Sequence, residues 1–140
     1  MYTISCETHF DAAHFLVNYN GKCKNIHGHR WRVCAYVSSE TLIESGEFRG
    51  MVMDFNHIKP VLNQIADSLD HKLVIEKDSL RSATMLMLEE EDFEIVELDF
   101  RPTAENFAKY VFDKLKENGV NPSKVRVYEA ATSYAEYSED

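Results

Sequence analysis

The segment CKNIHGHRWRV, residues 23–33, places a cysteine and two histidines within seven residues. The alternation that starts at His27 is typical of a β-strand, in which residues two apart point to the same face. The imidazoles of His27 and His29 can therefore reach one metal ion. His14, in the segment FDAAH just past the end of the first expected strand, can join them if that strand pairs with theirs. Three histidines leave a fourth tetrahedral position open, which is typical of catalytic rather than structural zinc.

Cys23 permits two interpretations. As a fourth ligand it would close the zinc site and make it structural. As a thiol between Lys22 and Lys24 it would be a general base or a nucleophile, because neighbouring positive charge favours the thiolate. The residue pattern leaves both alternatives open. Cys6 and Cys34 have no such neighbours, and we expect them to be small strand residues.

Two further positions carry candidate acid–base groups. Asp70 directly precedes His71, and a carboxylate beside a histidine can orient the ring and stabilise its protonated form. Glu129 has the strand parity of Val125 and Val127, so an acid stands where an apolar side chain is expected. If it is buried, such a carboxylate must be paired or hydrogen-bonded, either by a ligand with two adjacent N–H donors or by an internal ion pair. The alternative is an edge strand whose face is exposed to water.

Hydrophobic periodicity predicts the elements that position these residues. Alternating residues predict strands, and apolar residues three and four apart predict helices. The expected strands lie at residues 2–10, 27–37, 93–100 and 125–132, and the expected helices run from Asp54 or Asn56 to Leu69 and from Thr103 to Gly119. Residues 76–92 are charged and Met-rich, and they could form a loop or a short helix. This order favours one α+β domain over residues 1–140, with an antiparallel sheet.

The composition indicates a folded acidic protein. Of its 140 residues, 44% are hydrophobic and 28% charged, with a net charge of −9. Such acidity argues against nucleic acid as the main partner. An anionic substrate is still compatible with it where basic residues cluster, as Lys22, Lys24, Arg30 and Arg32 do.

The chain contains neither a membrane-spanning run nor a basic start followed by an apolar core, so we expect no membrane partner and no secretory signal. Its three cysteines are an odd count without regular spacing. We therefore expect a protein of the reducing cytoplasm without a disulfide framework.

Six segments together resemble a known family. They are FDAAH (10–14), C-KNI-HGH (23–29), MDFNHIK (53–59), LDHKL (69–73), RPTAENFA (101–108) and VYEAATS (127–133). In this order they resemble the 6-pyruvoyl-tetrahydropterin synthase and 6-carboxytetrahydropterin synthase family over nearly the whole chain. HGH alone is a weak signal, whereas its combination with the upstream cysteine, AAH and the downstream LDH is specific. The acidic segment 76–100 is longer than short family members require.

The resemblance implies one catalytic zinc ion per subunit, held by His14, His27 and His29. It implies that Cys23 is the general base and not a ligand. Zinc bound in this way is a Lewis acid for the hydroxyl groups of a substrate side chain.

The resemblance also assigns the remaining candidates. It implies that Asp70 and His71 form a proton relay that completes the catalytic set. Glu129 matches the acid that anchors the 2-amino and ring N–H groups of the pterin, and so counts as both catalytic and substrate-binding. Thr103 and Glu105 match the segment that lines the pterin pocket.

The family has the tunnelling fold, which is a four-stranded antiparallel sheet with two helices on one face. Three such sheets close into a barrel, and two trimers stack into a homohexamer. Active sites then lie between subunits, so Asp70 and His71 are expected to serve the Cys23 of a neighbour.

The implied activity is that of a zinc-dependent lyase. It converts 7,8-dihydroneopterin triphosphate to 6-carboxy-5,6,7,8-tetrahydropterin with release of acetaldehyde and triphosphate, a step towards queuosine and other 7-deazapurines. The compact chain favours this branch over a 6-pyruvoyl-tetrahydropterin synthase, which only eliminates triphosphate. Alternatives of another class are a non-catalytic structural zinc protein with Cys23 as fourth ligand and a pterin-binding module without turnover.

Overall fold

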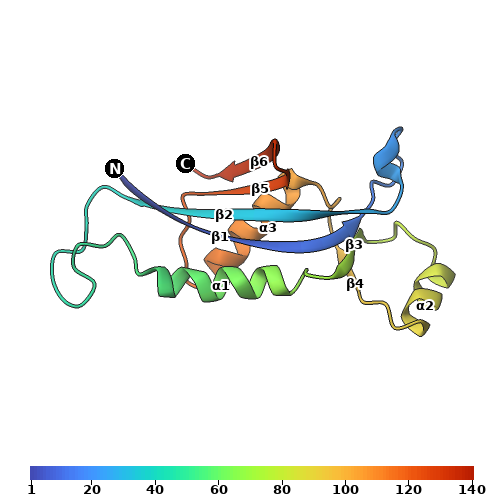
Figure 1. Ribbon diagram of the computed structural model, residues 1–140, viewed down its shortest axis with the longest axis horizontal. Helices are drawn as coiled ribbons and strands as arrows, with labels where there is room; N and C mark the ends of the chain where they lie inside the picture. Colours follow the sequence, from blue (N-terminus) through green and yellow to red (C-terminus); the bar gives the residue numbers. More distant parts are fainter.

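All 140 residues are described by the computed structural model, which has an α+β architecture (Figure 1). The elements in chain order are β1 (Tyr2–His14), η1 (Lys22–Lys24), β2 (His27–Ser39), α1 (Phe55–Asp67), β3 (Lys72–Glu76), α2 (Ser82–Glu90), β4 (Ile95–Leu98), α3 (Ala104–Glu117), β5 (Lys124–Ala130) and β6 (Ser133–Ser138). None of the helices is long and apolar enough to cross a membrane.

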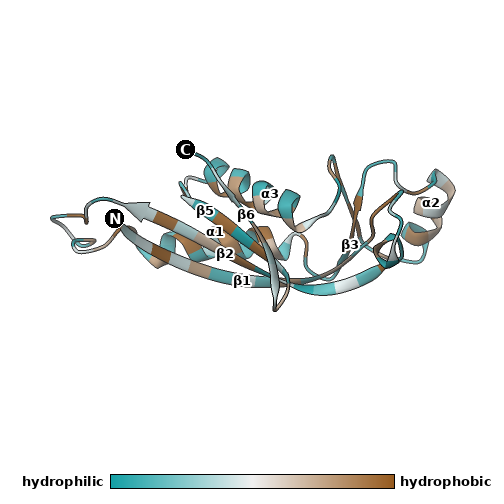
Figure 2. Ribbon diagram, turned by 90° about the horizontal axis from the view of Figure 1, so that it is seen from above, coloured by the Kyte–Doolittle hydropathy of each residue, from teal (hydrophilic) through white to brown (hydrophobic).

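The long antiparallel hairpin of β1 and β2 confirms the predicted pairing of the first two strands. The expectation that the first strand ends at residue 10 is wrong, because the alternation continues through Ala12 to His14, with Phe10, Ala12 and His14 all buried. The register pairs His14 directly with His27 at the loop end of the hairpin. Figure 2 shows hydrophobic and hydrophilic residues alternating along both strands.

The sheet differs from the expected four-stranded antiparallel one. It has six strands in the order β4-β3-β1-β2-β5-β6. The strands β1, β2, β5 and β6 do form a four-stranded antiparallel unit, but β3 and β4 extend it in parallel beyond β1. The strand β4 lies within the strand expected at residues 93–100. The strands β3 and β6 were not predicted, because β3 has only five residues and pairs with β1 at only two positions, and β6 has no buried residue. Strands so short carry little periodicity.

The helices α1 and α3 confirm the two predicted helices and their starting points. The side chain of Asp54 accepts a hydrogen bond of 2.9 Å from the backbone N–H of Asn56, and Thr103 caps α3 in the same manner. Such caps satisfy backbone donors that a helix start leaves free. A third helix, α2, lies apart at the end of the molecule that also carries η1 and has no buried residue, so the expectation of two helices was incomplete (Figure 1).

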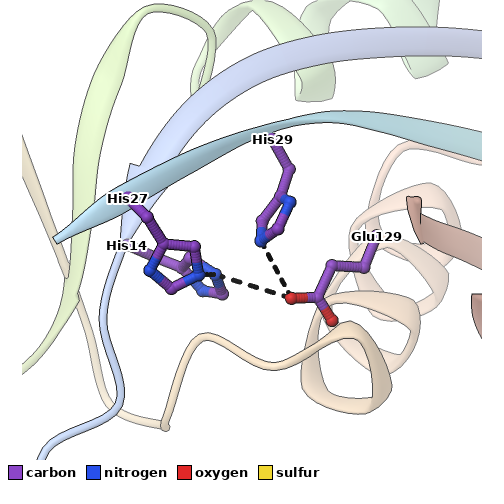
Figure 3. Close-up of side chains that lie close together, drawn as sticks. All are labelled: His14, His27, His29 and Glu129. Atoms are coloured by element: carbon purple, nitrogen blue, oxygen red, sulfur yellow. Dashed lines mark hydrogen bonds and ion pairs between the residues drawn. The ribbon is translucent and has the colours of Figure 1, made fainter. Parts of the chain in front are cut away.

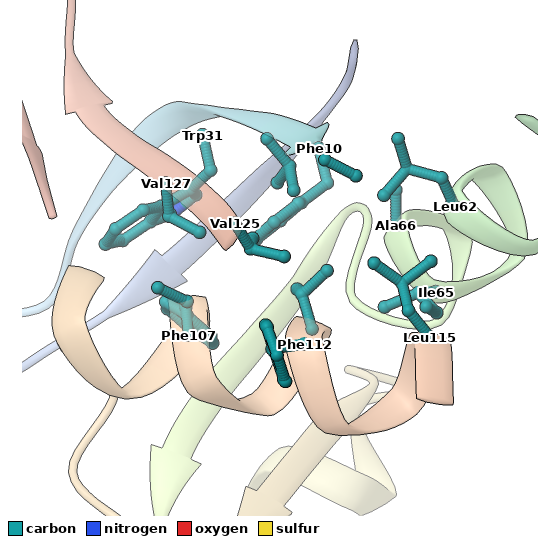
Figure 4. Packing of buried hydrophobic residues seen from close by; sticks show 14 of the residues in the cluster. Phe10, Trp31, Leu62, Ile65, Ala66, Phe107, Phe112, Leu115, Val125 and Val127 are labelled. Carbon is teal, nitrogen blue, oxygen red and sulfur yellow. The ribbon is translucent and has the colours of Figure 1, made fainter. Parts of the chain in front are cut away.

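The core lies between the sheet and the apolar faces of α1 and α3 (Figure 4). Phe10 and Trp31 are fully buried and stacked, with ring centroids 6.1 Å apart, and Phe107 of α3 packs edge-on against both. The ring of Trp31 is therefore held rigidly by its neighbours. It has the same strand parity as His27 and His29, and this places the core directly beneath the candidate site.

Candidate active site

The β1–β2 hairpin brings the three predicted histidines together (Figure 3). The ring centroids of His14, His27 and His29 lie 4.5–5.2 Å from one another. One nitrogen of each ring and a carboxylate oxygen of Glu129 all lie within 4.8 Å of one another. The predicted convergence of the imidazoles is thus present in the fold.

Backbone carbonyls fix the orientation of two of the rings. Nδ1 of His14 lies 2.7 Å from the carbonyl oxygen of Pro102, and Nδ1 of His27 lies 2.7 Å from that of Asn25. A carbonyl oxygen only accepts, so each Nδ1 must carry the proton, and each neutral ring directs the lone pair of Nε2 inward. The two Nε2 atoms lie 3.1 Å apart. Two facing lone pairs at this distance require a proton or a cation between them.

His29 completes a donor set that fits zinc. Its Nε2 is buried and lies 2.9 Å from Oε1 of Glu129, an ion-pair distance, but the contact lacks hydrogen-bond geometry and leaves the nitrogen unsatisfied. Burial lowers the pKa of His14 and of His29, although the Glu129 carboxylate opposes this effect. Both rings are thereby favoured in the neutral form that binds metal. Neutral imidazole nitrogens and a carboxylate oxygen are zinc ligands.

Trp31 forms the floor of the histidine group. Its ring centroid lies 4.9 Å from that of His14 and 5.3 Å from that of His29, with both rings nearly perpendicular to the indole. The indole is fully buried. An apolar floor of this kind keeps water away from one side of the site and strengthens electrostatic interactions there.

Glu129 reaches the histidines from β5 and lies at a β-bulge. The register passes from Tyr128 to Ala130 and skips Glu129, which is the extra residue. Bulges commonly redirect a side chain beside a functional site. Oε1 of Glu129 lies 2.9 Å from Nε2 of His29 and 3.8 Å from Nε2 of His14. Of the alternatives that the sequence left open, the structure contains an internal contact with His29, which is an ion pair only when that ring is protonated, while 35% exposure leaves the carboxylate accessible to a ligand.

Cys23 lies in the short turn η1, beside the histidine group but outside it. Its carbonyl oxygen accepts a hydrogen bond of 2.8 Å from the backbone N–H of Leu16, and its side chain is half-buried. Its thiol does not belong to the set of potential ligand atoms that includes the histidines. The other two cysteines are buried, which raises the pKa of Cys6 and raises that of Cys34 to about 11.

Asp70 and His71 form a hydrogen-bonded pair at the edge of β1. Oδ2 of Asp70 lies 2.7 Å from Nδ1 of His71, and its Oδ1 accepts a hydrogen bond from the backbone N–H of Asp11. The Asp11 N–H and then His71 lower the pKa of Asp70, whereas Asp70 raises the pKa of His71. His71 has a positive φ of 59°, a strained conformation that a non-glycine residue adopts mainly at special sites.

The two groups of predicted residues lie on different faces of the hairpin. His14, His27 and His29 share the parity of the buried residues, whereas Asp11 and its cross-strand partner Arg30 have the opposite parity. The carboxylates of Asp11 and Asp70 cluster with His71. His71 also lines an open groove of about 680 Å³, whose wall includes His29, Ile26 and the α2 region. Within one chain, the structure thus brings the relay pair together, and its potential ligand atoms form a cluster separate from that of the histidines.

Two other predicted residues lie at the start of α3. Thr103 is half-buried, and its Oγ1 accepts a hydrogen bond of 3.2 Å from the backbone N–H of Asn106. Glu105 is exposed in the first turn. The functional atoms that sequence reasoning missed nearby are the carbonyl oxygens of Pro102 and Asn25. Every residue has a carbonyl group, so no residue type signals them.

Comparison with known proteins settles the family. A family model described as 6-pyruvoyl tetrahydropterin synthase matches residues 3–140. The chain belongs to the 6-pyruvoyl tetrahydropterin synthase family. Within the family it is similar to the 6-carboxy-5,6,7,8-tetrahydropterin synthase of Haemophilus influenzae, with 34% identity over 99% of this chain and 100% of the relative. The protein of that name from Synechocystis sp. is 36% identical over 98% of this chain and 93% of its own length.

Solved structures of the family share the fold. A 6-pyruvoyl tetrahydropterin synthase from Caenorhabditis elegans superimposes with a TM-score of 0.71 at 23% identity, over 99% of this chain and 96% of the other. An uncharacterised protein from Wolinella succinogenes gives a TM-score of 0.78 at 22% identity, over 99% and 98%. At these identities the likeness concerns the fold alone.

Proposed function

We propose that the protein is a zinc-dependent lyase that converts 7,8-dihydroneopterin triphosphate and water to 6-carboxy-5,6,7,8-tetrahydropterin, acetaldehyde and triphosphate. The observation that carries the proposal is the convergence of three histidines, of which His14 is buried and His27 and His29 are half-buried, with the facing Nε2 atoms of His14 and His27 requiring a proton or a cation between them. The names of the relatives at 34% and 36% identity favour the carboxy branch.

His14, His27 and His29 would hold the zinc ion, and the Pro102 and Asn25 carbonyl groups would keep two of the rings in the required tautomer. Such carbonyl partners are a common support for metal-binding histidines. A bound zinc ion would supply Lewis acidity at the hydroxyl oxygens of the substrate side chain.

Cys23 is the proposed base. Elimination of triphosphate breaks a C–H bond and the C–O bond on the neighbouring carbon. The thiolate takes the proton, the C–H electron pair forms a C=C bond, and the C–O electron pair leaves with triphosphate. The position of Cys23 beside the histidine group, with its thiol outside the set of potential ligands, supports this role over that of a fourth ligand.

Asp70 and His71 are the proposed second proton carrier. The hydrogen bond from Asp70 holds the His71 ring in one orientation, and the exposure of that ring lets it meet a substrate bound elsewhere. A histidine whose pKa is raised by its partner is a suitable proton donor near neutral pH.

The separation of the relay pair from the histidines supports a site shared between two copies of the chain. The sheet ends at β4 and at β6, and β1 also lacks a partner on its outer side from Tyr2 to Asp11; the proposed contact joins this part of β1 to the outer side of β6. Edge-to-edge contacts between copies generate a ring if the rotation closes, and closure removes both exposed edges. The proposed assembly is a trimeric barrel or two stacked trimers, in which Asp70 and His71 of one copy act beside Cys23 of the next.

The pterin ring is assigned to Glu129, Thr103 and Glu105. Glu129 offers an accessible carboxylate beside the histidines, and a carboxylate can accept two N–H donors of a pterin at once. Thr103 and Glu105 stand at the start of α3, next to the Pro102 carbonyl that supports His14. On this assignment, the proposed pterin site lies between β5 and the start of α3.

Product analysis tests the reaction. Zinc-loaded protein is incubated with dihydroneopterin triphosphate, and acetaldehyde and pterin products are measured. Acetaldehyde and 6-carboxy-tetrahydropterin in equal amounts are expected. A pyruvoyl product without acetaldehyde would assign the protein to the 6-pyruvoyl branch, which the description of the family model favours. Absence of any pterin product would refute both assignments.

Mixing inactive variants tests the shared site. Cys23→Ala and His71→Ala chains are unfolded together, refolded in equal amounts and assayed. Random association in a ring gives about one quarter of the sites an intact Cys23 and an intact His71, so about a quarter of wild-type activity is expected. The same chains refolded separately and then mixed provide the control. No recovery in co-refolded assemblies would show that each site uses residues of one chain.

A further inference from the structure

The basic residues of the chain differ in whether they have an acidic partner. Of the 15 Lys and Arg side chains, eight have a carboxylate oxygen within 4.0 Å. Among those without one are Lys22 and Lys24, on either side of Cys23, and Arg101. In a chain with a net charge of −9, three such cations beside one loop are a notable local excess.

The cluster of four basic residues seen in the sequence is divided by the fold. Arg30 forms a bidentate pair with Asp11, with N–O distances of 2.9 and 3.1 Å. Arg32 donates to Glu7 at 3.0 Å. Both arginines lie on the hairpin face opposite the histidines, and their charge is already neutralised. Only the two lysines of the original cluster remain available at the Cys23 turn.

Arg101 adds a third cation to this turn. One of its terminal nitrogens donates a hydrogen bond of 2.9 Å to the carbonyl oxygen of Val17, and its guanidinium carbon lies 5.8 Å from the centre of the Tyr19 ring. The Tyr19 ring in turn packs against Gly21, where an added Cβ would lie 2.6 Å from Cε1 of the ring. Arg101, Tyr19 and Gly21 therefore form a continuous surface that ends at the residue preceding Lys22.

This surface lies at the rim of the histidine site. Arg101 precedes Pro102, whose carbonyl group holds His14, and Lys24 precedes Asn25, whose carbonyl group holds His27. Arg101 and Lys24 are thus each one residue away from a backbone carbonyl group that supports a candidate ligand. The half-buried Arg101 leaves most of its N–H donors without a partner, including a buried Nε. A cation in such a position is stabilised by an incoming anion.

We propose that Lys22, Lys24 and Arg101 form the subsite for the triphosphate group of the substrate. The inference rests on the proposed function, and it extends it by assigning the residues that bind the leaving group. A guanidinium group matches phosphate oxygens in geometry, and the two ammonium groups add positive charge beside Cys23. These cations also stabilise the negative charge that the departing triphosphate gains as the C–O bond breaks.

Inorganic tripolyphosphate tests the subsite without turnover. Its binding to the zinc-loaded protein is measured by calorimetry for wild type, Arg101→Gln, and Lys22→Gln combined with Lys24→Gln. Loss of a charged hydrogen-bonding partner predicts affinity about tenfold weaker for Arg101→Gln. The double lysine variant is expected to bind about threefold to tenfold more weakly, because both lysines are exposed.

A matched control separates local binding from net charge. The triple variant Lys22→Gln, Lys24→Gln, Arg101→Gln is compared with Arg49→Gln, Lys77→Gln, Arg81→Gln, which removes three exposed cations that also lack a carboxylate within 4.0 Å. At physiological salt, where the screening length is about 8 Å, the control is expected to change affinity less than about twofold. Equal weakening in both triple variants would refute the subsite.

The remaining outcomes separate this inference from the proposed reaction. If tripolyphosphate binds as expected but no pterin product forms, the anion subsite stands and the proposed reaction fails. If dihydroneopterin triphosphate is converted with an unchanged KM in the Lys22, Lys24 and Arg101 triple variant, the reaction stands and the subsite is wrong. A change of oligomeric state without a change in tripolyphosphate affinity would assign the lysines to a contact between copies instead. Because Arg101 also anchors Val17, Arg101→Lys and the double lysine variant, which spares the anchor, are measured in parallel.

Discussion

Replacing Cys23 with alanine distinguishes a catalytic from a structural metal site. The thiol lies outside the group of potential ligand atoms formed by the histidines and Glu129, in a turn without buried residues. We therefore expect the Cys23→Ala protein to retain one zinc ion per chain and to lose turnover. Its fold should be almost unaffected, because no core contact is removed.

A catalytic site and a closed structural site predict very different changes in the free energy of unfolding when Cys23 is replaced. A substitution away from the core typically changes the free energy of unfolding by no more than about 0.5 kcal/mol. For a chain of this size, that shifts Tm by no more than about 2 °C. A closed site with four protein ligands would contribute on the order of 10–16 kcal/mol of metal-binding free energy to folding. Removing one of its ligands would release the metal and lower Tm by on the order of tens of degrees.

The single tryptophan provides a direct assay. Trp31 is the only tryptophan in the chain, and its ring centroid lies 4.9 Å from that of His14. Its fluorescence should change when zinc is added to metal-free protein, and this titration can be combined with metal analysis and thermal unfolding. His29→Ala is the positive control, because it removes a proposed ligand and should abolish stoichiometric binding. If Cys23→Ala loses zinc as His29→Ala does, Cys23 is a ligand and its assignment as the base is wrong.

Three further predictions concern packing, thiol reactivity and the relay pair. Phe107→Ala removes a fully buried ring that packs on two others, so it should lower the free energy of unfolding by about 3–5 kcal/mol. Calorimetry measures this loss, and Phe93→Ala, at a residue that is 59% exposed, is the control that should have little effect. Alkylation of the native protein at neutral pH should label Cys23 alone, because burial raises the pKa of the other two thiols, and peptide mass mapping identifies the labelled site. Asp70 raises the pKa of His71, so Asp70→Asn should move the NMR titration of His71 towards lower pH. The pair stabilises the fold below the ordinary histidine pKa and loses this contribution as the pH rises through the raised pKa of His71. The assignment is contradicted if the difference in unfolding free energy between wild type and Asp70→Asn grows as the pH rises across this range.

The parts of the site that follow from strand parity could be predicted from the sequence. His27 and His29 are two residues apart in an alternating segment, and His14 ends the strand that pairs with it. Glu129 can be recognised in the sequence because it is an acid at a strand position where an apolar residue is expected. Its contact with His29 could not be foreseen in detail, because a bulge that skips one residue has no signature in the local sequence.

Other features had no sequence signal of sufficient length or type. The strand β3 has five residues, too few to establish a period against the background of neighbouring turns. The helix α2 has no buried face, so its residues show no helical repeat of apolar side chains. The contact between Asp70 and Asp11 uses a backbone N–H from a residue 59 positions away. Only the three-dimensional pairing of the turn with β1 reveals it.

The parity that brings the three histidines together is also the basis for proposing a site shared between two copies of the chain. Along β1, Ala12 and His14 face the core, whereas Asp11 lies on the other face and fixes Asp70 through its backbone. Adjacent positions of one strand therefore hold the two groups of proposed catalytic residues on opposite faces of the sheet. No rotamer change can bring them together, because the sheet itself lies between them. The free edges of β1 and β6 allow a ring of copies to place the outer face of one hairpin beside the Cys23 turn of the next. On this view, metal binding is a property of the single chain and turnover is a property of the assembly.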